Sequence, residues 1–386
     1  MKLKTLKDAP IKKGSRVILR VDFNVSLDGS QPEDILRINQ AIPTINYLLK
    51  KGAHLRIVSH LGRPDGKKVK KFSTRPIAVL LAKLLKRKVL FAPDVFSKEF
   101  WKKYNNFPGN IFFENIRFWP GEEKNDVKLA AALARWGDIY VNEAFSNSHR
   151  RHASIVAITK YLPSFAGPNF EKEVLYLTKI LKNPPKPLVA ILGGAKLETK
   201  LPLVRNFLSM GAKVVVGGAI ANSFLFAKGF AVGKSFVDKK MLKRLGIFGL
   251  LKNKRLYLPV DLRAAKRDFS SVRVLPLSGV KADEFVFDVG PKTAGFFGLI
   301  LKSARTIVWN GPLGLIERPE FSQGTLELAR RIRKIKALKV VGGGDSIAVL
   351  QKYKILSGFS HISTGGGAML EFLAGQKLPG VEVLKK

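Results

Sequence analysis

Charged side chains with related chemistry gather in the amino-terminal half of the sequence, near the expected ends of strands. Most are arginines, joined by a carboxylate, an amide and a histidine: Arg20, Asp22, Asn24, Arg37, His60, Arg63, Arg117, Arg150 and Arg151. A guanidinium offers a planar fork of donors that suits a carboxylate or a phosphate. A single arginine would more often pair with a surface carboxylate. Several in one cleft would bind a small, multiply charged anion.

Glycine-rich loops recur in the carboxyl-terminal half, after strand-like runs and before helical patterns. They are GGAK (193–196), GG (217–218), WNGPLG (309–314), GGGD (342–345) and STGGGA (363–368). Glycine lets a backbone approach a ligand closely, and a helix start offers unpaired N–H groups and a partial positive charge. Any one loop could simply complete a tight turn between a strand and a helix. The five together predict a phosphate-rich ligand.

Two other patterns are weak candidates for a site. GFAVGKS (229–235) resembles a P-loop but has three residues between its glycines where that motif needs four. His149 and His152 lie three residues apart without a carboxylate or cysteine companion, so a metal site is disfavoured. The chain has no cysteine, which excludes disulfides and thiolate metal sites.

Alternating strand-like and helical segments would position these groups. Runs rich in valine and isoleucine predict buried parallel strands: RVILRVDF, HLRIVSHL, DIYVNEAF, KPLVAILGG, AKVVVGGA, ARTIVWNG and ALKVVGGG. Helical patterns lie between them, among them RPIAVLLAKLLKRK, EKNDVKLAAALARW, KTAGFFGLILKSA and SQGTLELARRIRKI. This alternation predicts an α/β fold with helices on both faces of a sheet.

One helical pattern, at 171–183, is isolated by proline and glycine signals before it and by PPKP (184–187) after it. We expect it to connect two domains, each with its own sheet. The residues alone therefore predict a nucleotide-like site in one half and an anion site in the other. A phosphotransferase that closes two domains together fits both sites.

The formal net charge of +39, from 68 basic and 29 acidic residues, is unusually high. Such a field attracts phosphates, nucleic acid and anionic membranes. The excess is spread in short runs along the chain, which favours solvated helix faces over one nucleic-acid stripe. A nucleic-acid-associated protein is the main rival class, but no RRM, helix-turn-helix or zinc module supports it. The amino terminus lacks the apolar core region expected of a signal peptide, and the uncharged stretch at 214–227 is too short to span a bilayer. We expect a cytoplasmic protein.

An ordered set of motifs resembles the phosphoglycerate kinase family. The motifs are RVDFNV (20–25), SHLGRPDG (59–66), ENIRFWPGEE (114–123), NEAFSNSHRRHAS (142–154), ILGGAKLETK (191–200), IVWNGPLGLIE (307–317), GGGDS (342–346) and SHISTGGGAMLEFLAG (360–375). The resemblance implies two doubly wound, Rossmann-like domains with parallel sheets, joined by a connector helix and a hinge. Residues 1–168 would bind 3-phosphoglycerate, 169–183 would form the interdomain helix, 184–368 would bind the nucleotide, and 369–386 would return to the first domain.

The same resemblance implies the reaction and its partners. A monomeric, cytoplasmic enzyme of glycolysis and gluconeogenesis would transfer a phosphoryl group reversibly between ATP, with Mg²⁺, and the carboxylate of 3-phosphoglycerate. The products would be ADP and 1,3-bisphosphoglycerate. No membrane and no specific nucleic acid are expected, although weak, salt-sensitive binding to RNA or DNA fits the positive charge.

The resemblance implies a role for each residue of this chain that matches a family motif. Asp22 and Asn24 would hold the hydroxyl and carboxylate end of the substrate, and His60, Arg63, Arg117 and Arg150 would complete its anion pocket. Arg37 would bind substrate and neutralise the group in flight, and Lys196 would bridge the transferring phosphoryl. Gly366 and Gly367 would point helix-start N–H groups at that phosphate.

The nucleotide side of the site carries over in the same way. Lys200 would contact the nucleotide phosphates, Asp345 would hold the magnesium–nucleotide complex beside Ser346, and Glu317 would bind the ribose. The remaining expected nucleotide contacts are Gly193, Gly217, Gly218, Asn310, Pro312, Leu315, Gly343 and Gly344.

Some positions depart from the family pattern: Glu143, Ser146, Arg151, Thr199 and Ala219. These departures bear on substrate affinity or loop geometry, because every charged residue with an implied role is present. A phosphometabolite binder that has lost catalysis is a second rival, disfavoured by Arg37, Lys196 and Asp345.

Overall fold

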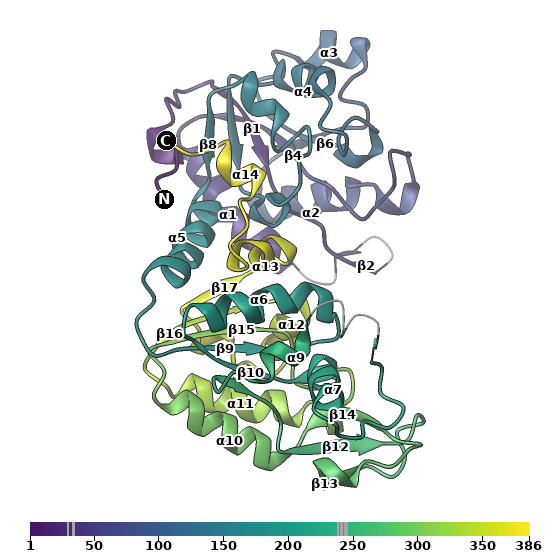
Figure 1. Ribbon diagram of the computed structural model, residues 1–386. Coiled ribbons are helices and arrows are strands. Elements are labelled where there is room, and N and C mark those ends of the chain that lie inside the picture. The colour runs from purple at the N-terminus through teal and green to yellow at the C-terminus, as the bar shows by residue number, and fades with distance from the viewer. Residues whose placement is uncertain (29–30, 33–34, 238, 240–241, 243–245) are drawn as a thin grey trace. The chain divides into compact units, whose positions relative to one another are not determined.

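The computed structural model describes residues 1–28, 31–32, 35–237, 239, 242 and 246–386 (Figure 1). It divides into two compact units. Unit 1 comprises Met1–Leu175 and Lys377–Lys386, and unit 2 comprises Tyr176–Gln376. Short 3₁₀ turns occur at Leu6–Asp8, Lys70–Phe72, Ile116–Phe118, Phe145–Asn147, Ala157–Lys160, Leu277–Gly279, Pro319–Phe321 and Leu356–Gly358.

Unit 1 is built on a six-stranded parallel sheet with the order β5-β6-β4-β1-β7-β8. The strands are β1 (Arg16–Arg20), β4 (His54–Val58), β5 (Val89–Ala92), β6 (Asn110–Phe113), β7 (Ile139–Asn142) and β8 (Ser164–Ala166). Helices α1 (Leu36–Lys50) and α2 (Arg75–Leu85) pack on one face, and α3 (Lys98–Tyr104) and α4 (Val127–Ala134) pack on the other. A small hairpin joins β2 (Leu27–Asp28) to β3 (Gln31–Pro32).

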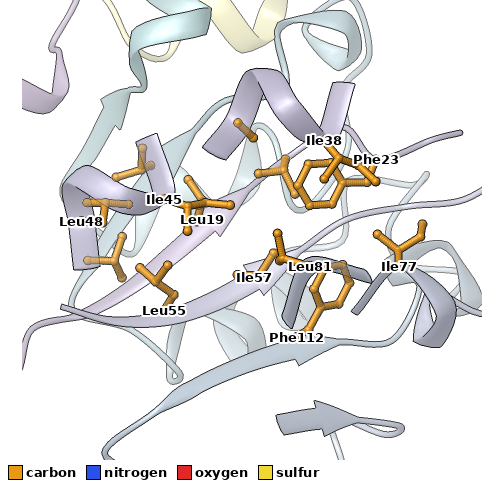
Figure 2. Close-up of a cluster of buried hydrophobic side chains, with 14 of the residues drawn as sticks. Leu19, Phe23, Ile38, Ile45, Leu48, Leu55, Ile57, Ile77, Leu81 and Phe112 are labelled. Atoms are coloured by element: carbon orange, nitrogen blue, oxygen red, sulfur yellow. The ribbon is translucent and has the colours of Figure 1, made fainter. Parts of the chain in front are cut away.

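Alternation along β1 explains why both faces of this sheet are covered. Val17 and Leu19 belong to the core beneath α1 and α2, whereas Ile18 belongs to the core beneath α4. Successive side chains of a strand point to opposite faces, so an unbroken apolar run requires cover on both. Figure 2 shows the first core, where Leu19 and Ile57 of the sheet meet Ile45 of α1 and Leu81 of α2.

Unit 2 has a second six-stranded parallel sheet, with the order β11-β10-β9-β15-β16-β17. Its strands are β9 (Leu188–Leu192), β10 (Lys213–Val216), β11 (Leu256–Tyr257), β15 (Thr306–Asn310), β16 (Leu338–Gly342) and β17 (His361–Ser363). In chain order within this unit they run 3-2-1-4-5-6, the arrangement of the Rossmann fold. The two parallel sheets confirm the predicted α/β, doubly wound fold.

The helices of unit 2 follow the strands in alternation. They are α6 (Leu197–Ser209), α7 (Gly218–Ala227), α9 (Ile247–Leu250), α10 (Pro291–Lys302), α11 (Gln323–Arg333), α12 (Gly344–Lys352) and α13 (Gly367–Leu373). Antiparallel strands β12 (Asp261–Ala265), β13 (Arg273–Pro276) and β14 (Phe285–Val289) form a separate sheet that the sequence did not predict. Among the helices that the structure describes, none combines the length and the apolar character needed to cross a bilayer.

Helix α5 (Pro168–Lys182) carries the chain from unit 1 into unit 2, and the chain later returns to unit 1. The returning segment contains α14 (Pro379–Glu382) and is fixed by backbone hydrogen bonds. Lys4 N donates to Leu384 O at 2.8 Å, and Gly380 N donates to Ser148 O at 2.9 Å. A side chain at Gly380 would meet the Ser148 backbone, so this approach requires glycine.

The carboxyl group of Glu143, in the loop after β7, caps the start of α5. Its Oε2 accepts hydrogen bonds from Asn169 N and Phe170 N, each at 3.0 Å, and its Oε1 accepts one from the Thr44 hydroxyl. Burial raises the pKa of Glu143 to about 7, against the lowering effect of these hydrogen bonds. The loop that carries part of the candidate anion site is thereby tied to the start of α5.

We expect Glu143→Gln to change how stability depends on pH. The folded pKa lies above the unfolded value of 4.5, so the stabilising contribution is complete below pH 4.5 and is lost as pH rises through about 7. Between pH 5 and pH 8 the free energy of unfolding of the wild type should fall by up to about 3 kcal/mol relative to that of the variant. Urea unfolding of both proteins measures this difference, and an unchanged difference would contradict the prediction. Asp288, whose pKa burial also raises to about 7, is common to both proteins.

Candidate active site

The site residues of unit 1 follow four neighbouring strands of its sheet. Asp22 follows β1, His60 follows β4, Arg117 lies in the turn after β6, and Arg150 lies in the loop after β7. These four strands are adjacent and parallel, so their carboxyl ends share one edge. The fold therefore gathers groups that are up to 128 residues apart in the sequence.

Asp22 is the centre of this cluster. It accepts hydrogen bonds from the Arg37 guanidinium and the Ser146 hydroxyl, and Asn24 N lies 3.2 Å from its Oδ1. Asn24 Oδ1 accepts a hydrogen bond from Gly62 N at 2.8 Å. A cavity of about 490 Å³ opens beside Asn24 and Gly62. The loops after β1 and β4 are thus held together at the rim of a cavity.

Arg117 and Arg150 supply positive charge to the same cluster. Arg117 is 3% exposed, and its Nη1 donates to Gly62 O at 2.7 Å. Burial and the nearby Arg150 lower the pKa of Arg117 to about 10, while the Glu123 carboxylate at 3.4 Å opposes the change. Arg117 therefore stays cationic at neutral pH. Crowded guanidiniums of this kind gain from an anion that comes between them.

Arg63 differs from the other predicted substrate ligands. It is exposed in the loop after β4 and makes no hydrogen bond or ion pair with any residue in the described part of the chain. Arg151 is exposed as well, whereas Arg20 is fully buried beneath the cluster. Arg20, one of the nine side chains that the sequence places near an anion cleft, therefore cannot line an open pocket.

The HxxH pair has other partners. His149 Nε2 accepts a hydrogen bond from Arg150 Nε at 3.2 Å, and burial lowers the pKa of His149 to about 4. His152 Nδ1 lies 3.5 Å from Glu122 Oε1. Within the described residues no group of three or more histidine or acidic side chains is placed to hold a metal ion.

In unit 2, the glycine loops lie at the carboxyl ends of β9, β10, β15, β16 and β17. Several glycines are required by the packing of one loop on another. A Cβ at Gly193 would overlap Pro312 O, and one at Gly218, where φ is +62°, would lie 2.7 Å from Gly194 N. A Cβ at Gly344 or Gly366 would meet no atom within 4 Å. Of these four glycines, only Gly344 and Gly366 leave open space beside the backbone.

Lys200 is a buried cation of unit 2. It lies in the first turn of α6, and its Nζ donates a hydrogen bond to Asn310 Oδ1 at the end of β15. Burial lowers the pKa of Lys200 to about 8, and the Asp345 carboxylate opposes this effect. Ser346 Oγ accepts a hydrogen bond from Gly311 N at 2.9 Å. The loops after β9, β15 and β16 therefore meet around Lys200.

The other predicted nucleotide ligands lie in the loops and helix starts that follow the strands of unit 2. Lys196 is the exposed N-cap residue of α6, and the Thr199 hydroxyl donates to its carbonyl at 3.0 Å. Glu317 is exposed beyond the loop after β15, and Leu315 N donates to Phe287 O at 2.9 Å. Gly366 is the N-cap of α13, with φ +52°, and Gly367 is the first helical residue.

The sequence did not single out three polar residues near the anion cluster. The sequence marks Ser146 only as a departure from the family pattern, yet its hydroxyl donates a hydrogen bond to Asp22. Glu122 and Ser154 are fully buried beneath the cluster and bond each other at 2.6 Å. A carboxylate in a tight turn between apolar runs was a signal for Glu122, whereas Ser154 gave none.

Comparison with known proteins agrees with this geometry. The model of the family described as "Phosphoglycerate kinase" matches residues 6–376. A phosphoglycerate kinase of Coprothermobacter proteolyticus is 42% identical, with alignment over 100% of this chain and 99% of the relative, and one of Geotalea uraniireducens is 43% identical over 96% and 95%.

Solved structures agree as well. The phosphoglycerate kinase of Coxiella burnetii has a TM-score of 0.86 at 37% identity, and that of Pyrococcus horikoshii OT3 has 0.87 at 33%. Each comparison covers 99% of this chain and 98% of the other. The chain therefore belongs to the phosphoglycerate kinase family, phosphotransferases (EC 2.7.2.3) that transfer a phosphoryl group reversibly between ATP and the carboxylate of 3-phosphoglycerate in glycolysis.

Proposed function

We propose that residues 1–168 bind 3-phosphoglycerate and residues 184–368 bind the nucleotide, with 169–183 joining them and 369–386 completing the first domain. The cluster of Arg37, Arg117 and Arg150 around Asp22 and His60 carries this proposal. Its positive charge suits a substrate that bears both a phosphate and a carboxylate.

The substrate ligands divide by the chemistry that each offers. Asp22 and Asn24 would hold the hydroxyl and carboxylate end of 3-phosphoglycerate, and Asp22 is already oriented by Arg37 and Ser146. The remaining anion contacts would come from His60, Arg63, Arg117 and Arg150. Arg37 would move its charge from Asp22 towards the phosphoryl group in transfer, because phosphoryl transfer needs charge stabilisation above all.

The nucleotide would bind around Lys200 in unit 2. Lys196 and Lys200 would pair with its phosphates, Glu317 would bind the ribose, and Asn310, Pro312 and Leu315 would line the site. Ser346 would lie beside the phosphates, as would the backbone of the glycines in this region: Gly193, Gly217, Gly218, Gly343 and Gly344. The starts of α6, α12 and α13 offer unpaired N–H groups to the phosphates.

Asp345 would hold Mg²⁺ together with the nucleotide. It is an exposed carboxylate near Lys200, and the described residues contain no larger acidic cluster. Magnesium is usually bound by one or two carboxylates, retained waters and substrate phosphates, so a single carboxylate fits an ion that arrives with ATP. When bound, the ion would neutralise charge on the β- and γ-phosphates.

The reaction requires no general base, because the nucleophile is already a carboxylate. A carboxylate oxygen of 3-phosphoglycerate would bond to the γ-phosphorus while the bond from that phosphorus to the ADP oxygen breaks. Lys196, Arg37 and the N–H groups of Gly366 and Gly367 would stabilise the charge on the group in transfer. We propose that the domains close about a hinge to align the reactants and exclude water.

We further propose a monomeric enzyme of the cytoplasm. The net charge of +39 supports an additional weak, sequence-independent association with nucleic acid. Counterion release would make such binding strongly dependent on salt. It would accompany the kinase activity and would not replace it.

Nucleotide binding should be coupled to protonation of Lys200. Because its pKa is about 8, about half of the free enzyme carries a neutral Lys200 at pH 8. Phosphate oxygens favour the cation and raise the pKa, so MgADP binding should take up about half a proton at pH 8 and almost none at pH 6. Calorimetric titration in buffers of different ionisation enthalpy measures this uptake.

Lys200→Met should remove most of this uptake and weaken MgADP binding, while Lys302→Met serves as the matched control because Lys302 is exposed on α10. Equal proton uptake by the wild type and Lys200→Met would place the nucleotide away from Lys200.

A further inference from the structure

Four buried polar side chains form a continuous chain beneath the anion cluster of unit 1. Glu122, Ser154 and Arg20 are 0% exposed, and His60 is 3% exposed. They come from separate segments: the turn after β6, the loop after β7, the end of β1 and the loop after β4. Burial of this much charge is costly unless each group is paired. The way in which they are paired determines what His60 offers to a ligand.

Ser154 bridges the Glu122 carboxylate and the Arg20 guanidinium: it donates a hydrogen bond to the first and accepts one from the second. Its Oγ donates a hydrogen bond to Glu122 Oε1 at 2.6 Å, and its backbone N donates to Glu122 Oε2 at 2.9 Å. The Tyr140 hydroxyl donates to Ser154 O at 2.6 Å, which fixes the serine backbone. Because the hydroxyl proton is committed to Glu122, the oxygen accepts from Arg20 Nε, which lies 2.9 Å away.

Arg20 in turn determines the role of His60 Nδ1. Its Nη1 donates to Val21 O, and its Nη2 lies 3.3 Å from His60 Nδ1. A guanidinium has five donors and no acceptor, so His60 Nδ1 must be the acceptor. An uncharged imidazole that accepts at Nδ1 carries its proton on Nε2.

The surroundings of His60 favour its uncharged form. The titratable and charged groups that face it are Arg20, Arg37, Arg117, His152 and Asp22. Burial and the neighbouring cations hold the pKa of His60 well below its usual range. The only carboxylate among these groups, Asp22, lies 3.9 Å from Nδ1, beyond hydrogen-bond distance.

We propose that Glu122, Ser154 and Arg20 are positioning residues that hold His60 as the neutral Nε2–H tautomer. His60 then gives the substrate a hydrogen-bond donor without adding another positive charge to a crowded set of arginines. The opposite tautomer would present an Nε2 lone pair, which repels an anion. This inference rests on the proposed placement of 3-phosphoglycerate beside His60, but the tautomer itself exists without substrate.

Nitrogen-15 NMR of the histidine rings in the full-length protein tests the tautomer directly. The chain has only five histidines, and the His60 signals are those missing from His60→Gln. The wild type should show His60 with its proton on Nε2, unchanged from pH 5.5 to pH 8. A protonated or Nδ1–H His60 in the wild type would overturn the proposal.

Ser154→Ala breaks the chain at its centre, while Ser154→Thr retains a hydroxyl. We expect Ser154→Ala to mix the His60 tautomers and to raise the KM for 3-phosphoglycerate about tenfold, with kcat changed less than twofold. Ser154→Thr should restore the wild-type pattern. Ser148→Ala is the matched control, because it removes another fully buried hydroxyl that has no hydrogen-bond partner among the described residues.

A wild-type tautomer and KM in Ser154→Ala would overturn the positioning role, even if that variant were less stable. The substrate placement fails separately: His60→Gln with an unchanged KM for 3-phosphoglycerate would contradict it, whatever the NMR spectrum shows.

Discussion

Lys196→Ala should lower kcat by about 10²–10³-fold, the usual cost of removing one group that stabilises transition-state charge. Lys196 is the N-cap residue of α6 and is exposed, so its removal should not disturb the fold. The KM for 3-phosphoglycerate should change little, because Lys196 belongs to unit 2 and we propose that 3-phosphoglycerate binds unit 1. The rate of ATP consumption that depends on 3-phosphoglycerate, with the acyl phosphate removed by a coupling reaction, measures the effect.

Lys302→Ala is the matched control for this variant, since it removes an exposed lysine of the same domain without a proposed role. Equal rates in Lys196→Ala and Lys302→Ala would show that Lys196 does not act on the transferring group.

Arg37→Ala should have a still larger effect, about 10³-fold or more on kcat, with a smaller rise in the KM for 3-phosphoglycerate. The guanidinium is only partly buried, at 29% exposure, and pairs with Asp22. It is therefore oriented by Asp22 and still partly exposed, as its proposed role requires. Asp22 keeps its hydrogen bond from Ser146 in the variant, which limits the structural damage. The same coupled assay measures this loss.

Arg37→Lys should recover part of the rate, because it restores the charge without the planar fork. Arg151→Ala, which removes an exposed arginine of the same domain, should retain the wild-type rate. A rate in Arg37→Ala within tenfold of the wild type would contradict the assigned role.

The parallel sheets and the common edge of the site could be predicted because their signals are local. Strand β9 is apolar at every position, and β1 and β15 are apolar at their three central positions, which marks strands covered on both faces. Residues directly after such strands must meet at one edge of a parallel sheet. This rule alone brings Asp22 and His60 together, although 38 positions separate them.

The antiparallel sheet of β12, β13 and β14 was not predicted because its apolar pattern is weak. In β13 only Leu275 is buried, the first three residues of β14 are only partly buried, and the core cluster of this sheet is small. The glycine loops show a different limit. Sequence cannot distinguish Gly193, which packs against another loop, from Gly366, which has open space beside it. That distinction depends on tertiary contacts more than 100 residues away for Gly193.

The contacts made by the residues that depart from the family pattern also could not be predicted from the sequence. Ser146 adds a hydrogen bond to Asp22, so this change affects the orientation of a proposed ligand. Glu143 reaches the first N–H groups of α5, and Thr199 bonds the Lys196 carbonyl. No contact in the described part of the chain explains Ala219 or Arg151.

Separate binding of the two ligands tests the central claim, that 3-phosphoglycerate and the nucleotide occupy different domains. Calorimetry would titrate each ligand alone into the wild type, Arg37→Ala and Lys196→Ala. We expect Arg37→Ala to weaken 3-phosphoglycerate binding and to leave MgADP affinity unchanged, and Lys196→Ala to leave 3-phosphoglycerate affinity unchanged. Loss of MgADP binding in a folded Arg37→Ala, or of 3-phosphoglycerate binding in a folded Lys196→Ala, would contradict it.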